Sequence, residues 1–126
     1  MNLVDSDVLI DVWRGHPPAK AWLAACTAIP SVPGFVVMEL VQDVKNGQEL
    51  RQALRLAEYF PTVWPSEADL TAALANSTRF RLSHGLGLID SLIAATAVGR
   101  GATLLTFNTK HYRFIPDLAI AQPYQR

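Results

Sequence analysis

Three carboxylates stand where a solvated surface charge is not expected, and they are the residues of this chain best suited to chemistry. Asp5 follows the short apolar run Leu3-Val4 and precedes a segment with helical apolar spacing. Glu39 lies in a segment whose neighbours are almost all apolar, so we expect it to be at least partly buried. Asp90 stands at the start of an apolar helical segment, where the helix dipole favours its ionised form. An isolated buried charge is unfavourable unless it is paired or metal-bound, so each acid needs an explanation.

These acids could converge on one metal ion. If Asp5 ends a strand of a parallel sheet, it lies at the carboxyl edge, where ligand sites of α/β sheets gather. Glu39 and Asp90 fall in the first or second turn of predicted helices, and such helices begin at the same edge. Ser6 can cap the first helix, which would leave Asp5 free to bind a metal. Carboxylates arranged in this way predict a site for a hard cation such as Mg²⁺ or Mn²⁺.

Each carboxylate also has a purely structural explanation. Asp5 could itself cap the helix, and Asp90 could serve only the helix dipole. Glu39 could pair with an arginine such as Arg79 or Arg81. From the residues alone, both explanations stay open for all three.

Short strands and helices alternate along the chain. The apolar spacing, with Pro, Gly and Ser signals at the ends, predicts helices over about 8–13, 19–28, 33–45, 48–60, 67–82 and 88–98. The predicted strands are 3–4, 29–32, 61–65, 103–106 and 118–120, and 107–115 is expected to be a polar, basic connection. This alternation favours an α/β fold with a parallel sheet and helices on both of its faces.

Length and composition narrow the class of protein. The 126 residues suffice for a single domain, 1–126, but not for two. The 11 basic residues balance the 11 acidic ones, so nucleic-acid binding would depend on local basic patches. The single cysteine, Cys26, cannot form an internal disulfide, which is typical of a reducing cytoplasm. Since we find neither a membrane-spanning segment nor a signal peptide, we expect a cytoplasmic protein.

Four segments match a known family in order and spacing: Leu3–Asp11, Val37–Leu40, Leu88–Ala97 and Ala102–Tyr112. On these segments the chain resembles PIN-domain proteins, of the kind found as VapC-type toxins in bacterial toxin–antitoxin pairs. The resemblance extends over essentially the entire chain. It implies a PIN-like three-layer α/β/α sandwich with a short-stranded, mainly parallel central sheet.

The resemblance also implies an endoribonuclease that depends on Mg²⁺ or Mn²⁺, with RNA as substrate and a cognate antitoxin as partner. Its acidic cluster would be Asp5, Glu39 and Asp90, with Asp5 and Asp90 as the principal metal ligands. Glu39 would bind the metal through water or act as general base. Asn108 matches the family's fourth catalytic position, which is often Asp; Asn keeps an oxygen ligand but removes one negative charge. Asp7 matches a frequent but variable position, so we expect it to hold the metal ligands in place without binding the metal itself.

Two further groups could serve partners. An apolar stripe on the helix that carries Glu39 exceeds what one core face needs, so we expect it to be buried in a homodimer or under an antitoxin segment. Its members are Val37, Leu40, Val41 and Val44.

A basic group lies beside Asn108 at the other end of the chain. Lys110, His111 and Arg113 could hold an RNA phosphate, and the hydroxyl of Thr106 could contact water or phosphate. A solvated loop next to a polar site explains the same residues equally well.

Two other functions remain open. A catalytically silent PIN domain would act only as a binding or regulatory module, and the Asn at position 108 keeps this alternative alive. A haloacid-dehalogenase-type phosphatase would use Asp5 as its nucleophile, because Asp5-x-Asp7 followed by Val8 resembles its motif. We find no counterpart of that class's downstream lysine and acidic pair.

Overall fold

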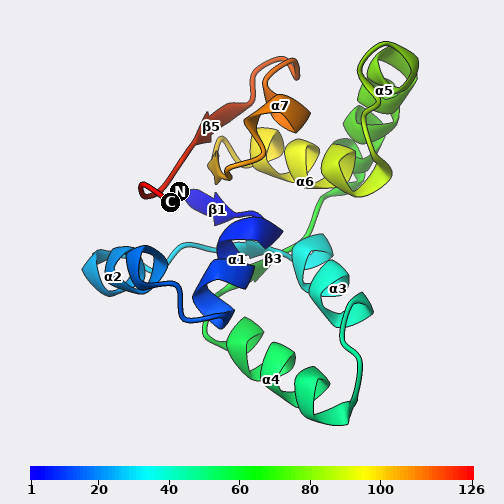
Figure 1. The fold of residues 1–126 in the computed structure, drawn as a ribbon. Helices are drawn as coiled ribbons and strands as arrows, with labels where there is room; N and C mark the ends of the chain where they lie inside the picture. The colour runs from blue at the N-terminus through cyan, green and yellow to red at the C-terminus, as the bar shows by residue number, and fades with distance from the viewer.

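The computed structural model describes residues 1–126, which form five strands and seven helices (Figure 1). The strands are β1 (Asn2–Val4), β2 (Val32–Pro33), β3 (Thr62–Val63), β4 (Thr103–Leu105) and β5 (Ala119–Ala121). The helices are α1 (Ser6–Trp13), α2 (Pro17–Ala25), α3 (Gly34–Gln42), α4 (Gly47–Glu58), α5 (Glu67–His84), α6 (Leu88–Gly99) and α7 (Thr109–Tyr112). The predicted alternation of strands and helices is confirmed.

The strands all pair in parallel. One sheet has the order β1-β4-β5, and a second consists of β2 and β3. A bridge between Leu3 and Ser31 joins the two sheets, because Val4 N–H donates to Ser31 O and Ser31 N–H donates to Asn2 O. Val4 lies opposite Leu105, so β1 and β4 end side by side. The residues that follow these two strands therefore share one edge of the sheet.

Helices pack on both sides of the short strands and complete the predicted α/β/α sandwich (Figure 1). Leu3 and Leu104 of the central strands are fully buried, as are Val8 of α1 and Ile93 of α6. Burial of these apolar side chains is the main force that holds the layers together. None of the helices combines the length and the apolar character that a membrane crossing would need.

The sequence signals for helix α5 are confirmed at both ends. Asp69 N–H donates to Ser66 Oγ at 3.1 Å, and Ser66 N–H donates to Asp69 Oδ2 at 3.0 Å, which forms a capping box at the predicted start of the helix. The helix continues to His84, two residues beyond the predicted end. Gly85 stops it with φ at 68°, a left-handed conformation that favours glycine.

Two predicted assignments are wrong, and other element ends differ from the predicted ones by up to three residues. Thr109–Tyr112, expected to be part of a connection, form the short helix α7. Four residues are too few to show a helical period, so no apolar pattern could reveal this turn. Pro33 pairs with Val63 in the second sheet and precedes α3, although we expected it to be that helix's first residue.

The C-terminal residues are tied to the far end of α1. Asp11 is 8% exposed, and its carboxylate accepts hydrogen bonds from Tyr124 Oη at 2.8 Å and from Arg126 Nε and Nη2 at 3.1 Å each. Burial raises the pKa of Asp11, but the hydrogen bonds from Arg126 and Tyr124 outweigh it and hold the pKa below its usual value. This buried acid is fully paired within the chain.

Candidate active site

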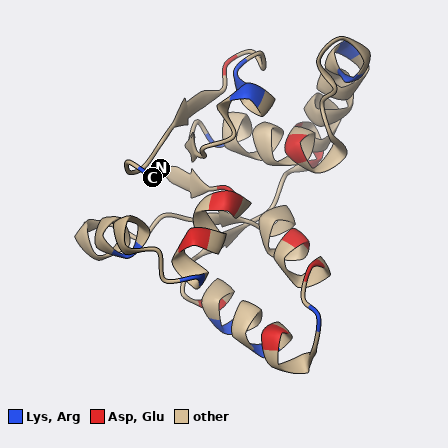
Figure 2. Ribbon diagram, in the orientation of Figure 1, with Lys and Arg blue, Asp and Glu red and all other residues tan.

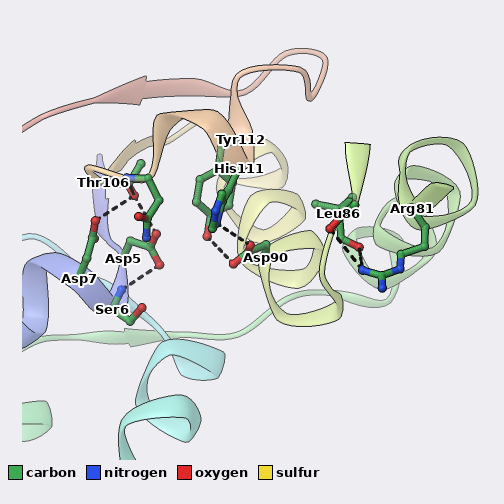
Figure 3. A network of polar contacts seen from close by, with 11 residues as sticks. Asp5, Ser6, Asp7, Arg81, Leu86, Asp90, Thr106, His111 and Tyr112 are labelled. Atoms are coloured by element: carbon green, nitrogen blue, oxygen red, sulfur yellow. Dashed lines mark hydrogen bonds and ion pairs between the residues drawn. The ribbon is translucent and has the colours of Figure 1, made fainter. Parts of the chain in front are cut away.

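Asp5 occupies the point where β1 ends and α1 begins (Figure 3). It is the N-cap of α1, and its Oδ1 accepts a hydrogen bond from Ser6 N–H at 2.8 Å. The expectation that Ser6 would take the capping position is therefore wrong, since Ser6 is the first helical residue. A carboxylate has two oxygens, so Asp5 can satisfy the helix with one and still present the other to a neighbour.

Thr106 is that neighbour, and it follows β4 at the same edge of the sheet. Its hydroxyl donates to Asp5 Oδ2 at 2.8 Å and accepts a hydrogen bond from Asn108 N–H at 3.0 Å. Asp7 supports the same segment, because its Oδ2 accepts a hydrogen bond from Phe107 N–H at 2.8 Å. Thr106 thus links the first and fourth strands, a role that the sequence did not indicate.

Asp90 lies in the first turn of α6 and is held from α7 (Figure 3). Tyr112 Oη donates to Asp90 Oδ1 at 3.1 Å, and His111 Nδ1 lies 3.4 Å from Asp90 Oδ2. Tyr112 is 1% exposed, so its hydroxyl group is fixed by packing. Sequence reasoning missed Tyr112, because its contact with Asp90 depends on the placement of a helix too short to predict.

Glu39 lies in the second turn of α3 and is half-buried. The molecule contains two ion pairs, His111–Asp90 and Arg126–Asp11, and neither involves Glu39. Arg81, one of the two arginines considered as its partner, donates instead to the carbonyl oxygens of Gly85 and Leu86. The other candidate partner, Arg79, lies over the ring of Phe80, 4.8 Å from its centroid. An ion pair with Arg79 or Arg81 therefore does not explain the half-buried carboxylate of Glu39.

Burial and neighbouring acids raise the pKa values of Asp5 and Glu39. Burial, followed by repulsion from Asp7, raises the pKa of Asp5 to about 6, against the lowering effect of its hydrogen bonds; Asp90 adds a smaller repulsion. Burial, followed by repulsion from Asp5, Asp90 and Asp43, raises the pKa of Glu39 to about 7. Perturbed carboxylates of this kind gather at functional sites.

Asn108 stands at the exposed border of this space. It is the residue before α7, and its side chain makes no capping hydrogen bond to that helix. Its backbone N–H is fixed by Thr106, so the position of the residue is set while its amide remains available. Asp5 thus follows β1, Asp90 lies in the first turn of α6 and Asn108 precedes α7, while Glu39 is close enough to Asp5 and Asp90 for their charges to repel it.

The chemistry of these donors fits a hard divalent cation. All of the candidate ligands are oxygens, and Asp5 and Glu39 carry negative charge that no Lys or Arg balances. No three acidic, His or Cys side chains are grouped closely enough to hold an ion by themselves. Mg²⁺ does not require such a cage, because it keeps several waters and needs only one or two protein carboxylates.

Known proteins resemble this chain over nearly its full length. A sequence profile of the PIN domain matches residues 3–115. Ribonuclease VapC19 of Mycobacterium tuberculosis is 33% identical over 123 residues, which cover 94% of this chain and 97% of that protein. Ribonuclease VapC10 of the same organism is 36% identical over 121 residues, with 94% and 90% covered. A solved toxin–antitoxin complex from Klebsiella pneumoniae contains a chain that aligns with a TM-score of 0.78 and 26% identity, covering 100% of both chains.

Proposed function

Because this chain belongs to the PIN domain family, we propose that it is a metal-dependent endoribonuclease that acts as the toxin of a toxin–antitoxin pair. The observation that carries the proposal is the gathering of Asp5, Glu39 and Asp90 at one edge of the sheet, with no Lys or Arg paired to them. The relatives named as ribonucleases, which align with 94% of the chain, support the same activity.

The proposed roles follow from how each acid is held. A bound Mg²⁺ or Mn²⁺ would supply an activated water and charge stabilisation at the phosphate. Asp5 and Asp90 are the proposed ligands, since hydrogen bonds fix their carboxylates while each oxygen keeps a further lone pair. Glu39 has no partner and a pKa raised to about 7, which suits a general base at neutral pH. Asn108 would orient water or phosphate through its neutral amide.

An antitoxin segment is the proposed partner of the α3 surface. Phe35, Val37, Met38 and Trp64 line an apolar groove that also includes Glu39. Met38 and Trp64 are each 53% exposed, whereas Leu40 of the predicted stripe is buried in the core. A partner seated in this groove would cover Glu39 and so silence the site. The solved toxin–antitoxin complex, 26% identical in sequence, supports a partner of this kind.

We also propose that the chain forms a homodimer. Exposed apolar residues remain on α5 away from the α3 groove, where Leu74 is 68% exposed and Leu82 is 98% exposed. Burial of these side chains against a second copy would remove them from water.

The direct test is cleavage of RNA by the purified protein. We expect cleavage only after addition of Mg²⁺ or Mn²⁺, and we expect EDTA to stop it. Asp90→Asn should abolish cleavage without changing the circular dichroism spectrum. Glu58→Gln is the matched control, because Glu58 is an exposed acid at the end of α4. Cleavage at the parent's rate by Asp90→Asn, or in EDTA, would refute the proposal.

A silent binding module is the second candidate. Two observations favour it: Asn stands in place of a fourth acid, and no three side chains form a complete metal cage. Growth arrest on expression of the chain separates the two functions. If arrest persists in both Asp5→Asn and Asp90→Asn, the module is favoured; if both relieve it, the nuclease is favoured.

The phosphatase alternative has lost support. The PIN domain profile matches residues 3–115, and the sequence has no counterpart of the downstream lysine and acidic pair that a phosphatase of this class needs. We expect no phosphoryl mass increase on Asp5 after trapping with a phosphate ester. Detection of phosphorylated Asp5 would restore this alternative.

A further inference from the structure

Residues 70–116 contain five Lys and Arg residues and one acid, whereas the rest of the chain contains six Lys and Arg residues and ten acids (Figure 2). Between residues 70 and 116 the only acid is Asp90, which lies in the candidate active site, while the basic residues there are Arg79, Arg81, Arg100, Lys110 and Arg113. The next acid is Asp117, just beyond this range. A chain with no net charge thus presents a basic region beside its acidic site, and a local basic region is what contact with RNA phosphates requires.

Aromatic rings from α5 and from the end of α7 meet within this basic region. The rings of His84 and Phe114 are stacked, with centroids 4.4 Å apart and planes inclined by 26°. Phe80 packs against both and is buried, whereas His84 is exposed. Ser83 Oγ lies 2.7 Å from His84 Nδ1 and fixes the orientation of the imidazole. The stack therefore ends in a solvent-facing, oriented ring.

Helix α7 and the residues after it lie between the candidate active site and this stack. His111 of α7 lies 3.4 Å from Asp90, and Phe114 follows two residues after the helix ends at Tyr112. Lys110 and Arg113 flank them and are exposed, as is Arg79 at the other side of the stack. Residues 91–116, which include α7 and Phe114, contain no acid that would repel an RNA strand leaving Asp90. Figure 3 shows the part of this segment where His111 and Tyr112 point to Asp90.

We propose that this surface binds the single-stranded RNA on one side of the cleavage site. A base stacks on the free face of His84, and Arg79, Lys110 and Arg113 contact the phosphates around it. Stacking on an aromatic ring accepts any base, and arginine and lysine contact phosphates without reading sequence. The surface therefore contributes affinity and direction to the strand. This inference rests on the proposed ribonuclease function, because it assigns the path of that substrate.

The test is binding of a short fluorescein-labelled single-stranded RNA, measured by anisotropy in EDTA so that the RNA stays intact. We expect His84→Ala to weaken binding, so that the dissociation constant rises about tenfold. His84→Phe, which keeps a ring, should bind within about twofold of the parent. Arg113→Ala should also weaken binding, and its salt dependence should be shallower by about 0.7 in log–log slope.

Arg55→Ala is the matched control, because Arg55 is an exposed arginine on α4, outside this surface. It should bind like the parent. If His84→Ala keeps the parent's affinity, or if Arg55→Ala weakens binding as much as Arg113→Ala, the proposed surface is wrong. Cleavage of the same RNA with Mn²⁺ separates this failure from failure of the function. A parent that cleaves while all variants bind alike refutes only the surface, and a parent that does not cleave refutes the function.

Discussion

The two ends of helix α1 hold two buried aspartates in opposite electrostatic conditions. Asp11, at the far end, receives three hydrogen bonds from Tyr124 and Arg126, and its pKa lies below the usual value. Asp5, at the sheet edge, has no cationic partner, and burial with repulsion from Asp7 raises its pKa to about 6. Both are almost inaccessible, at 8% and 2% exposure. Burial alone therefore does not distinguish a structural acid from a functional one.

The two aspartates differ in whether the chain supplies a counter-charge for the carboxylate. The chain itself supplies the counter-charge for Asp11, so that acid contributes to stability as folded. At the sheet edge the chain supplies more acids instead, and their repulsion is unfavourable until a cation arrives. Natural proteins retain such unfavourable arrangements mainly where function needs them. The comparison thus supports the proposal that the sheet edge is a cation site, whereas the Asp11 cluster is a structural clasp.

The largest expected difference between the two regions is in catalysis. Asp5→Asn should lower RNA cleavage about 10³-fold or more, because it removes a proposed metal ligand that supports several kcal/mol of transition-state stabilisation. Asp11→Asn should leave the rate per folded molecule within about twofold of the parent. Both rates are measured with saturating Mn²⁺ on the same RNA. Equal losses in the two variants would remove the distinction between the two acids.

The next difference is in how stability responds to pH in EDTA. The folded pKa of Asp5, about 6, exceeds the unfolded value of about 3.9, so ionised Asp5 destabilises the fold above pH 6. This penalty, on the order of 3 kcal/mol, disappears as the pH falls from about 6 to about 4. Asp11 has a lowered folded pKa, so its contribution is present above about pH 4 and is lost as the pH falls through its folded pKa.

Urea unfolding across the acid range should therefore show stability that rises from pH 7 to about pH 4 and then falls. Asp5→Asn should flatten the rise, and Asp11→Asn should flatten the fall. A parent that loses stability steadily from pH 7 downward would contradict the raised pKa of Asp5.

The smallest expected effect concerns stability at neutral pH. Asp11→Asn should lower the free energy of unfolding by about 1 to 2 kcal/mol, because it removes the charge but keeps an oxygen for Tyr124. The side chain of Arg126 is 48% exposed, so solvent already weakens this ion pair. Asp5→Asn should be neutral or stabilising in EDTA. Urea unfolding at pH 7.5 measures both, and a larger loss for Asp5→Asn would show that Asp5 is the structural acid.

Most of the fold could be predicted because local signals agreed with one another. The Ser66–Asp69 capping box and the apolar periods of α5 and α6 located those helices within a few residues. The run before Asp5 and the run before Thr106 located the two central strands. Pairing of those parallel strands then placed the residues after them at one edge.

The supporting contacts could not be predicted in the same way. Thr106 touches Asp5 across about a hundred residues of sequence, and Tyr112 reaches Asp90 only because α7 packs beside α6. The Asp11 clasp depends on the side chains of Tyr124 and Arg126, in a chain end that has no pattern of its own. The prediction that Ser6 rather than Asp5 caps α1 was also wrong, because both Asp and Ser are common capping residues.

The central claim, that the sheet edge binds a divalent cation and the Asp11 clasp does not, can be measured without RNA. The measurement is titration of Mn²⁺ into metal-free protein at pH 7.5, with the free ion followed by electron paramagnetic resonance. The parent and Asp11→Asn should both remove Mn²⁺ from solution, whereas Asp5→Asn should leave it free. Binding of Mn²⁺ by Asp5→Asn as tightly as by the parent would contradict the account.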